Sequence, residues 1–154
     1  MSETLRLRRA GPADAAAVRA LTRQAYARWV PLIGREPKPM QADYVAAVAN
    51  HRIDLAYIGE QLVGLIETIA ETDHLLIENV AVSPAFQGRG IGRSLMAHAE
   101  QFAAAMGYDL VRLYTNQRFA ENVALYLKLG WRIDREEVVA VGTVVHMSKA
   151  VRFL

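Results

Sequence analysis

A glycine-rich segment in the middle of the chain contains the residues whose types and spacing point most directly to chemistry. Residues 83–93 read Ser-Pro-Ala-Phe-Gln-Gly-Arg-Gly-Ile-Gly-Arg, between an apolar stretch and one rich in alanine and leucine. Glycine lets backbone N–H groups approach a ligand closely, and the first turn of a helix supplies unpaired N–H donors with partial positive charge. This combination predicts an anion site suited to a pyrophosphate, with the guanidinium groups of Arg89 and Arg93 nearby.

Two common phosphate-binding motifs do not fit this segment. A dinucleotide-binding Gly-x-Gly-x-x-Gly that starts at Gly88 would need glycine at position 93, where arginine stands. One that starts at Gly90 would need glycine at position 95, where leucine stands. A Walker loop would need lysine where Arg93 follows Gly92. A nucleotide-binding regulator is therefore disfavoured. The remaining interpretations are a different pyrophosphate ligand or a plain glycine-rich helix start.

The elements that must position this segment are predicted from hydrophobic periodicity and turn signals. Strands are expected at 4–9, 54–58, 62–70, 75–82, 110–115, 131–139 and 143–149, and helices at 14–29, 41–50, 90–106 and 120–129. The strand, helix and strand between 75 and 115 form a βαβ unit, which makes its two strands parallel neighbours. Asp14 is expected to cap the first helix, and three prolines exclude regular helix from 30–40.

Composition narrows the function classes. The chain has 154 residues, 53% of them hydrophobic and 22% charged, with a net charge of +2 and no cysteine. No apolar run approaches the ~20 residues of a membrane span, the start has no secretory signal, and no basic stripe indicates a nucleic-acid partner. The absence of cysteine excludes disulfides and thiolate chemistry, and the four histidines are too dispersed for a metal site. We expect a single cytoplasmic domain spanning 1–154.

Two motifs resemble a known family. The pattern Gln87-x-x-Gly90-x-Gly92, preceded by Val-Ala-Val-Ser-Pro at 80–84, resembles the acyl-CoA signature of the GNAT superfamily of N-acyltransferases. Downstream, Leu-Tyr-Thr-Asn at 113–116 and the stretch 121–131 are similar to the family's second motif, with Trp131 replacing its commoner Phe or Tyr. The resemblance implies an α/β fold with a central twisted mixed sheet of about seven strands flanked by about four helices. It also implies an acyl-CoA-dependent N-acyltransferase with acetyl-CoA as co-substrate and no metal.

The resemblance implies a set of cofactor-binding residues. In the family the strand before the loop bulges and splays from its neighbour, so that its backbone binds the pantetheine arm and one N–H polarises the thioester carbonyl; here that group is at Val80. The implied set is Val80, Ala81, Val82, Gln87, Gly88, Arg89, Gly90, Ile91, Gly92, Arg93, Asn116, Asn122 and Tyr126. Asn116 and Asn122 either contact the cofactor or cap a helix start.

Two side chains are candidates for proton transfer. The resemblance makes Tyr126 the general acid that protonates the departing thiolate, whereas its spacing with Val123 and Leu127 alone would favour a core aromatic. Glu78 is the candidate general base, relaying the amine's proton through water. The alternatives for Glu78 are a site for the substrate ammonium or an ion pair, and Glu67 is a weaker competitor.

The site that binds the acceptor amine is expected around the proline-rich segment 30–40, which covers the acceptor site in the family. Candidate substrate-binding residues are Tyr26, Trp29, Ile33, Arg35 and Glu78, with Met40 beside them. Arg35 and Glu36 would recognise an acidic or amino group, or are surface charges. The expected acceptor is the primary amine of a small molecule, attacking directly in a ternary complex. The alternative is a non-catalytic acyl-CoA-binding sensor, and the strands over 131–149 could pair in a homodimer.

Overall fold

A single mixed sheet forms the centre of the molecule. The computed structural model describes residues 4–151, and expectations for residues 1–3 and 152–154 lie outside the described residues. The strands are β1 (Leu5–Arg9), β2 (Arg52–Ile58), β3 (Gln61–Ala70), β4 (Leu75–Val82), β5 (Leu110–Asn116), β6 (Arg132–Val139) and β7 (Gly142–Ala150), in the order β1-β2-β3-β4-β5-β7-β6. Only β4 and β5 run parallel. The predicted seven-stranded mixed sheet and its βαβ unit are confirmed.

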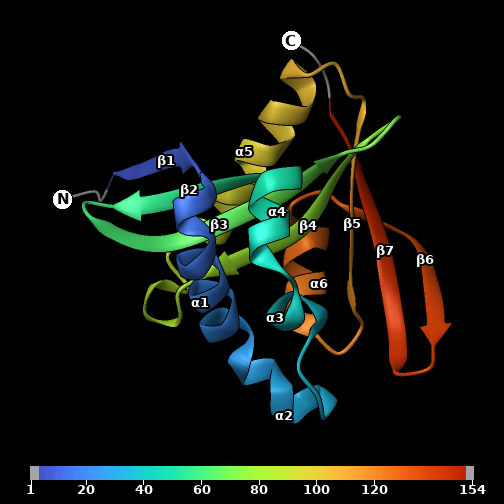
Figure 1. The fold of residues 1–154 in the computed structure, drawn as a ribbon. Helices are drawn as coiled ribbons and strands as arrows, with labels where there is room; N and C mark the ends of the chain where they lie inside the picture. The colour runs from blue at the N-terminus through green and yellow to red at the C-terminus, as the bar shows by residue number, and fades with distance from the viewer. Residues whose placement is uncertain (1–3, 152–154) are drawn as a thin grey trace.

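Helices cover both faces of this sheet, with α1 and α4 in front and α5 and α6 behind (Figure 1). The longer helices are α1 (Ala15–Tyr26), α4 (Tyr44–Asn50), α5 (Ile91–Ala105) and α6 (Ala120–Lys128), each inside a predicted range. Val18 of α1 packs with Leu55 and Leu65 in the front core, and Leu95 of α5 packs with Val111 in the rear core. Within residues 4–151 no helix is long and apolar enough to cross a membrane.

No regular helix runs through 30–40, as expected, but the expectation missed two short helical turns. This segment forms two single turns, α2 (Val30–Ile33) and α3 (Lys38–Gln41), with Gly34 in the left-handed conformation after the first. Pro31 and Pro39 lie in the first turn of each, where the missing N–H has no intrahelical acceptor to lose. The prolines therefore set the starts of these helices rather than excluding them.

The expectation that Asp14 caps α1 is wrong. Asp14 ends a short 3₁₀ turn, Pro12–Asp14, with helical backbone angles, so its side chain does not reach back over the first turn of α1. Its carboxylate instead accepts the N–H of Gly11 at 2.8 Å and both terminal nitrogens of Arg8 at 2.9 and 3.0 Å. Asp14 thus fastens the first strand to the turn that precedes α1.

The wedge between β4 and β5 is the feature that creates the site. The two strands pair only where Leu75–Ile77 lie beside Val111–Leu113, although β4 continues to Val82 and β5 to Asn116. Past that point β4 stays with β3, and β5 stays with β7. The backbone of β4 that faces β5 therefore has no strand partner there, as the family resemblance predicted.

A β-bulge lies where the two strands begin to separate. Glu67 of β3 is opposite Asn79 and Thr68 is opposite Ile77, so that Glu78 is the extra residue of β4. The resemblance implied a bulge in this strand, and the structure has one at Glu78. Exposure still alternates along β4, so Glu78 and Val80 share the less buried face. Bulges re-aim side chains next to functional sites, and this one directs Glu78 toward the wedge.

Candidate active site

A cavity of about 320 Å³, called here the main cavity, fills the wedge between β4 and β5. Its walls come from β4, β5, the end of α1, the segment 33–39, the start of α6 and the tip of the β6–β7 hairpin. The lining residues are Tyr26, Ile33, Arg35, Pro37, Lys38, Pro39, Ile77, Glu78, Asn79, Val80, Leu113, Tyr114, Thr115, Asn116, Phe119, Asn122, Tyr126, Val139, Val141 and Val144. This volume lies at the lower end of the range for small-molecule sites.

A smaller cavity of about 130 Å³, the side cavity, continues from the main cavity toward the start of α5. It is lined by Ala25, Tyr26, Trp29, Val80, Val82, Gly92, Met96, Asn122, Leu125 and Tyr126. Four of these residues, Tyr26, Val80, Asn122 and Tyr126, also line the main cavity. The two spaces therefore meet at Val80 and Tyr126, with the glycine-rich loop at one end and the 33–39 segment at the other.

The glycine-rich loop has the geometry of an anion site. Gly88 and Gly90 have φ values of 81° and 82°, and a Cβ at either position would have no atom within 4 Å. Gly90 is the N-cap of the 15-residue helix α5, and the first backbone bond of that helix runs from the N–H of Ser94 to Gly90. The N–H groups of Ile91, Gly92 and Arg93 consequently have no acceptor within the helix.

Side chains of the glycine-rich loop make contacts that hold its backbone in place. Gln87 donates from Nε2 to the carbonyl of Val82 at 3.2 Å, which ties the loop to the end of β4. The guanidinium of Arg89 stacks on the ring of Phe86 at 4.9 Å. Gly92 faces Val82: a Cβ placed on Gly92 would lie 3.8 Å from Cγ2 of Val82. The residues predicted to bind a pyrophosphate thus form one continuous loop at the open end of β4.

Tyr126 stands between the two cavities. Its hydroxyl makes no hydrogen bond to any residue within 4–151, and burial raises the pKa of Tyr126 to about 12. The end of α6 fixes its place: Gly130 has a φ of 95°, its N–H bonds to Leu127, and the N–H of Trp131 bonds to the carbonyl of Tyr126 at 3.0 Å. This is a Schellman ending. The Trp131 ring packs 6.2 Å from the Tyr126 ring.

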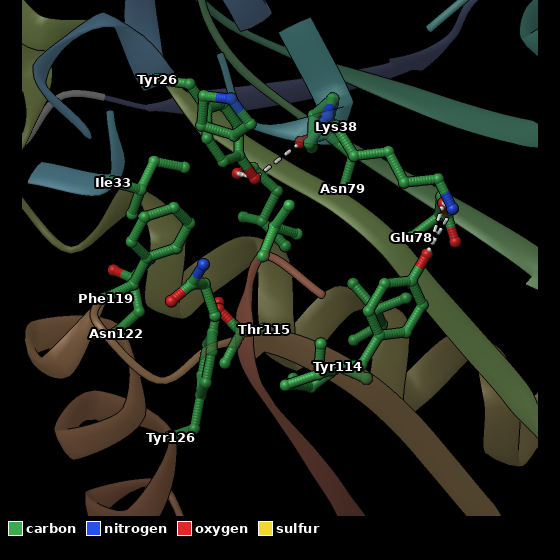
Figure 2. Close-up of a pocket in the computed structure, with 18 of the residues that line it drawn as sticks. Tyr26, Ile33, Lys38, Glu78, Asn79, Tyr114, Thr115, Phe119, Asn122 and Tyr126 are labelled. Atoms are coloured by element: carbon green, nitrogen blue, oxygen red, sulfur yellow. Dashed lines mark hydrogen bonds and ion pairs between the residues drawn. The ribbon is translucent and has the colours of Figure 1, made fainter. Parts of the chain in front are cut away.

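Glu78 belongs to a network on the opposite side of the main cavity from Tyr126, as Figure 2 shows. The Tyr114 hydroxyl donates to Oε1 of Glu78 at 2.9 Å, and Nζ of Lys38 lies 3.7 Å from the same oxygen. Lys38 also donates to the Tyr114 hydroxyl at 3.1 Å. Burial raises the pKa of Tyr114, which keeps it a donor to Glu78. The carboxylate is thus fixed in position and faces the cavity.

The buried side chain of Asn79 positions β4 between these two sides. It donates from Nδ2 to the hydroxyls of Thr22 and Tyr44, at 3.2 and 3.3 Å. The Tyr26 hydroxyl lies 2.9 Å from Oδ1 of Asn79 and 3.2 Å from the carbonyl of Val80. Burial raises the pKa of Tyr26, so this hydroxyl stays protonated. Helices α1 and α4 are thereby hydrogen-bonded to the strand that carries Glu78 and Val80.

This architecture is shared with known proteins. A family model described as Acetyltransferase (GNAT) family matches residues 17–131. The chain belongs to the GNAT acetyltransferase family. The resemblance drawn from its sequence motifs is thereby confirmed.

Two proteins are similar to this chain in sequence. The Bacillus subtilis (strain 168) protein YxbD, described as uncharacterized, is 32% identical over 94 residues, or 61% of this chain and 58% of its own length. The N-acetyltransferase YvbK of the same organism, also described as uncharacterized, is 31% identical over 82 residues, or 51% and 52%. The match thus spans little more than half of these relatives.

Solved GNAT structures match over nearly the whole chain. The PaiA N-acetyltransferase of Thermoplasma acidophilum, solved with coenzyme A, has a TM-score of 0.80 at 15% identity and covers 96% of this chain and 99% of its own. The ribosomal-protein-S18-alanine N-acetyltransferase of Escherichia coli has a TM-score of 0.79 at 16% identity, with coverage of 98% and 96%. At these identities the likeness concerns the fold.

The two predicted asparagines differ within this GNAT site. Asn116 accepts the N–H of Arg118 on its own side-chain oxygen at 2.9 Å, so it fixes the turn before α6, although it also lines the main cavity. Asn122 lines both cavities, and its carboxamide has no partner among residues 4–151. Asn122 thus has its whole carboxamide available to a ligand, and Asn116 has only its Nδ2 group.

The candidates for acceptor binding do not all reach the same place. Tyr26, Ile33 and Arg35 line the main cavity, whereas Trp29 lines the side cavity and stacks on Phe119 with 4.6 Å between ring centroids. Met40 is buried and lines neither. Glu36 does not face a ligand, because Arg23 binds both of its carboxylate oxygens, at 2.6 and 3.3 Å.

Sequence reasoning missed Lys38, Asn79 and Tyr114. Tyr114 precedes Asn116 by two residues on one strand and could have been found by that spacing; Lys38 and Asn79 carry no such signal.

A third cavity of about 230 Å³ adjoins the main cavity at Lys38, Pro39, Glu78 and Asn79, and Glu67 is part of its lining. Burial raises the pKa of Glu67, against the opposing effect of His51 at 2.6 Å. Nowhere in residues 4–151 do three or more His, Asp or Glu side chains gather as a metal site.

Proposed function

We propose that this protein is an N-acetyltransferase that moves the acetyl group of acetyl-CoA to the primary amine of a small molecule, by direct attack in a ternary complex. The observation that carries the proposal is the meeting of two cavities at Val80 and Tyr126. One cavity leads to an anion-binding loop and the other to a small, largely apolar space with a carboxylate. A donor entering from one side and an acceptor from the other would have their reacting atoms at this junction.

The residues present fit an acyl-CoA. The open N–H groups at the start of α5 and the left-handed Gly88 and Gly90 suit the pyrophosphate. The wedge between β4 and β5 leaves strand backbone for an extended arm, and Asn122 offers a free carboxamide beside it. When bound, acetyl-CoA supplies the acetyl group as an activated thioester.

The chain's own groups account for the proton movements. Glu78 accepts the proton of the acceptor amine through water, which frees the nitrogen lone pair to form the new C–N bond. The Val80 N–H stabilises the charge that develops on the carbonyl oxygen. As the C–S bond breaks, Tyr126 gives its phenol proton to the departing sulfur. The nitrogen of the adduct passes its second proton through water to the oxygen of Tyr126, which restores the phenol, and Glu78 returns its proton to solvent.

Release of free thiol from acetyl-CoA, measured with a panel of primary amines, tests this proposal. The expected result is thiol release that depends on an amine, together with a product heavier by one acetyl group. Isothermal titration with acetyl-CoA in the same preparation provides the comparison. Binding of acetyl-CoA without thiol release from any amine would contradict the proposal and favour a non-catalytic acyl-CoA sensor.

A further inference from the structure

An arginine in the wall of the main cavity has no anionic partner. The side chain of Arg35 lines this cavity, and its Nε is buried without a hydrogen-bond partner. Within residues 4–151, its one polar contact is a long bond from Nη1 to the carbonyl of Glu36, at 3.5 Å. A buried N–H of a charged group that lacks an acceptor costs stability. A ligand that supplies an acceptor would remove this cost.

Neither Glu36, the next residue in the chain, nor Glu78, the acidic residue of the cavity lining, supplies it. Glu36, the next residue, is bound by Arg23 through both oxygens, and Arg23 also donates to the carbonyl of Met40 at 2.9 Å. This pair fastens the 33–39 segment to α1 and turns Glu36 away from Arg35. Glu78 on the far wall is bound by Tyr114 and paired with Lys38. Arg35 is therefore left as the unpaired charge among the three charged residues that line the cavity.

The rest of the wall is apolar. Ile33, Leu113, Phe119, Val139, Val141 and Val144 supply most of its remaining surface. Sites of this kind bind an apolar body and orient it through a few polar groups. A guanidinium is the preferred partner of a carboxylate, because its parallel N–H groups match both oxygens.

We propose that the acceptor is an amino carboxylate with an apolar body, whose carboxylate is bound by Arg35. This inference rests on the proposed acetyl transfer and adds the class of acceptor. Arg35 then determines specificity by holding the acceptor so that its amine faces the junction of the two cavities.

Matched pairs of acceptors test the inference in the thiol-release assay. Suitable pairs are phenylalanine with 2-phenylethylamine, leucine with 3-methylbutylamine, and 6-aminohexanoate with hexylamine. The expected result is a kcat/KM at least about tenfold higher for the carboxylate member of at least one pair, as for a charge-assisted hydrogen bond. Arg35→Gln should abolish that preference by raising KM for the carboxylate, with the plain amine unaffected, and Arg35→Lys should retain part of it.

Arg118→Gln is the matched control, because Arg118 lies outside the cavity lining and donates to the carbonyl of Leu32 in α2, just before the 33–39 segment. It should keep the preference. Equal use of both members of every pair by the unmodified protein, or an equal loss for both members in Arg35→Gln with unchanged Tm, would overturn the inference and leave acetyl transfer standing. No thiol release from any amine would instead overturn the proposed function, and the inference with it.

Discussion

At Tyr126, burial and the lack of a hydrogen-bond partner act in the same direction. Burial raises the pKa of its phenol to about 12, so the proton stays on the oxygen at neutral pH. Because that proton is not given to any acceptor within residues 4–151, it remains available to a group at the junction of the two cavities. Glu78 is held differently, since the Tyr114 hydroxyl donates to it at 2.9 Å and Lys38 lies 3.7 Å from the same oxygen.

Replacing the Tyr126 hydroxyl should separate catalysis from binding. Tyr126→Phe keeps the ring that packs on Trp131 and removes only the proton donor. We expect kcat to fall at least about tenfold while the affinity for CoA, measured by titration calorimetry, stays within about twofold. Turnover close to that of the unmodified enzyme would remove the general-acid role.

The pH dependence of the rate should identify the base. If Glu78 is the base, protonation at low pH abolishes activity, and the acid limb of the kcat/KM profile disappears in Glu78→Gln at a lower plateau. Glu67→Gln is the matched comparison and should keep the acid limb. Because the raised pKa of Tyr126 keeps its proton in place, Tyr126 should cause no alkaline loss below about pH 11. An acid limb that survives in Glu78→Gln and disappears in Glu67→Gln would transfer the role to Glu67.

Two kinds of element create the site: a pair of strands that separate and a loop that ends at a helix. The bulge at Glu78 lies where β4 loses β5, so the same irregularity turns a carboxylate toward the wedge and frees the backbone beyond it. At the far end of β4 the glycine-rich loop leads into α5, whose first N–H groups have no acceptor within the helix. Donor and acceptor regions thus lie along one strand.

A glycine substitution in the glycine-rich loop can be compared with one in the turn between β2 and β3. Gly90 and Gly59 have φ values of 82° and 60°, and a Cβ at either would have no atom within 4 Å. Alanine at each should therefore lower the free energy of unfolding by a similar amount, about 1–2 kcal/mol. Only Gly90→Ala should raise KM for acetyl-CoA, by about tenfold or more, since it crowds the open N–H groups. An equal KM in both variants would argue against a pyrophosphate at this loop.

On the scale of the molecule, helices cover both faces of the central strands, and α1 connects the first strand to the site. The Arg8–Asp14 pair fastens β1 to the turn before α1, and Tyr26 at the end of α1 bonds to Val80. Arg8 also donates to the Tyr57 hydroxyl at 2.9 Å. The arrangement of α1 against the sheet therefore depends in part on an ion pair far from the cavities.

The pH dependence of stability should report this pair. Arg8 lowers the pKa of Asp14 to about 2, below its ordinary value of 3.8. A lowered folded-state pKa stabilises the protein above the ordinary value, and that contribution is lost as pH falls toward 2. Asp14→Asn should reduce Tm by about 2–4 °C at pH 7, with a difference that shrinks between pH 4 and pH 2. A difference in Tm that is constant with pH would mean that the charge of Asp14 does not act in this way.

The sequence by itself determined the order of the elements, the mixed sheet, the loop at the end of β4 and the family. These follow from periodicity and from short motifs, such as Gln87 to Gly92, whose geometry is local to the backbone. Prediction from the local sequence pattern missed the two short helices that begin with a proline. It also missed that the Asp14 side chain binds Arg8 and does not cap α1.

Only the tertiary structure decided which side chains share the cavity. Lys38 and Tyr114 are 76 residues apart and meet at Glu78, and Tyr26 reaches Val80 across 54 residues. Contacts of this kind depend on how far β4 and β5 separate and on where α1 lies on the sheet. Neither is written in the local sequence, because both result from the packing of distant segments. For the same reason the isolation of Arg35, which carries the inference about the acceptor, became visible only once Glu36 was found bound to Arg23.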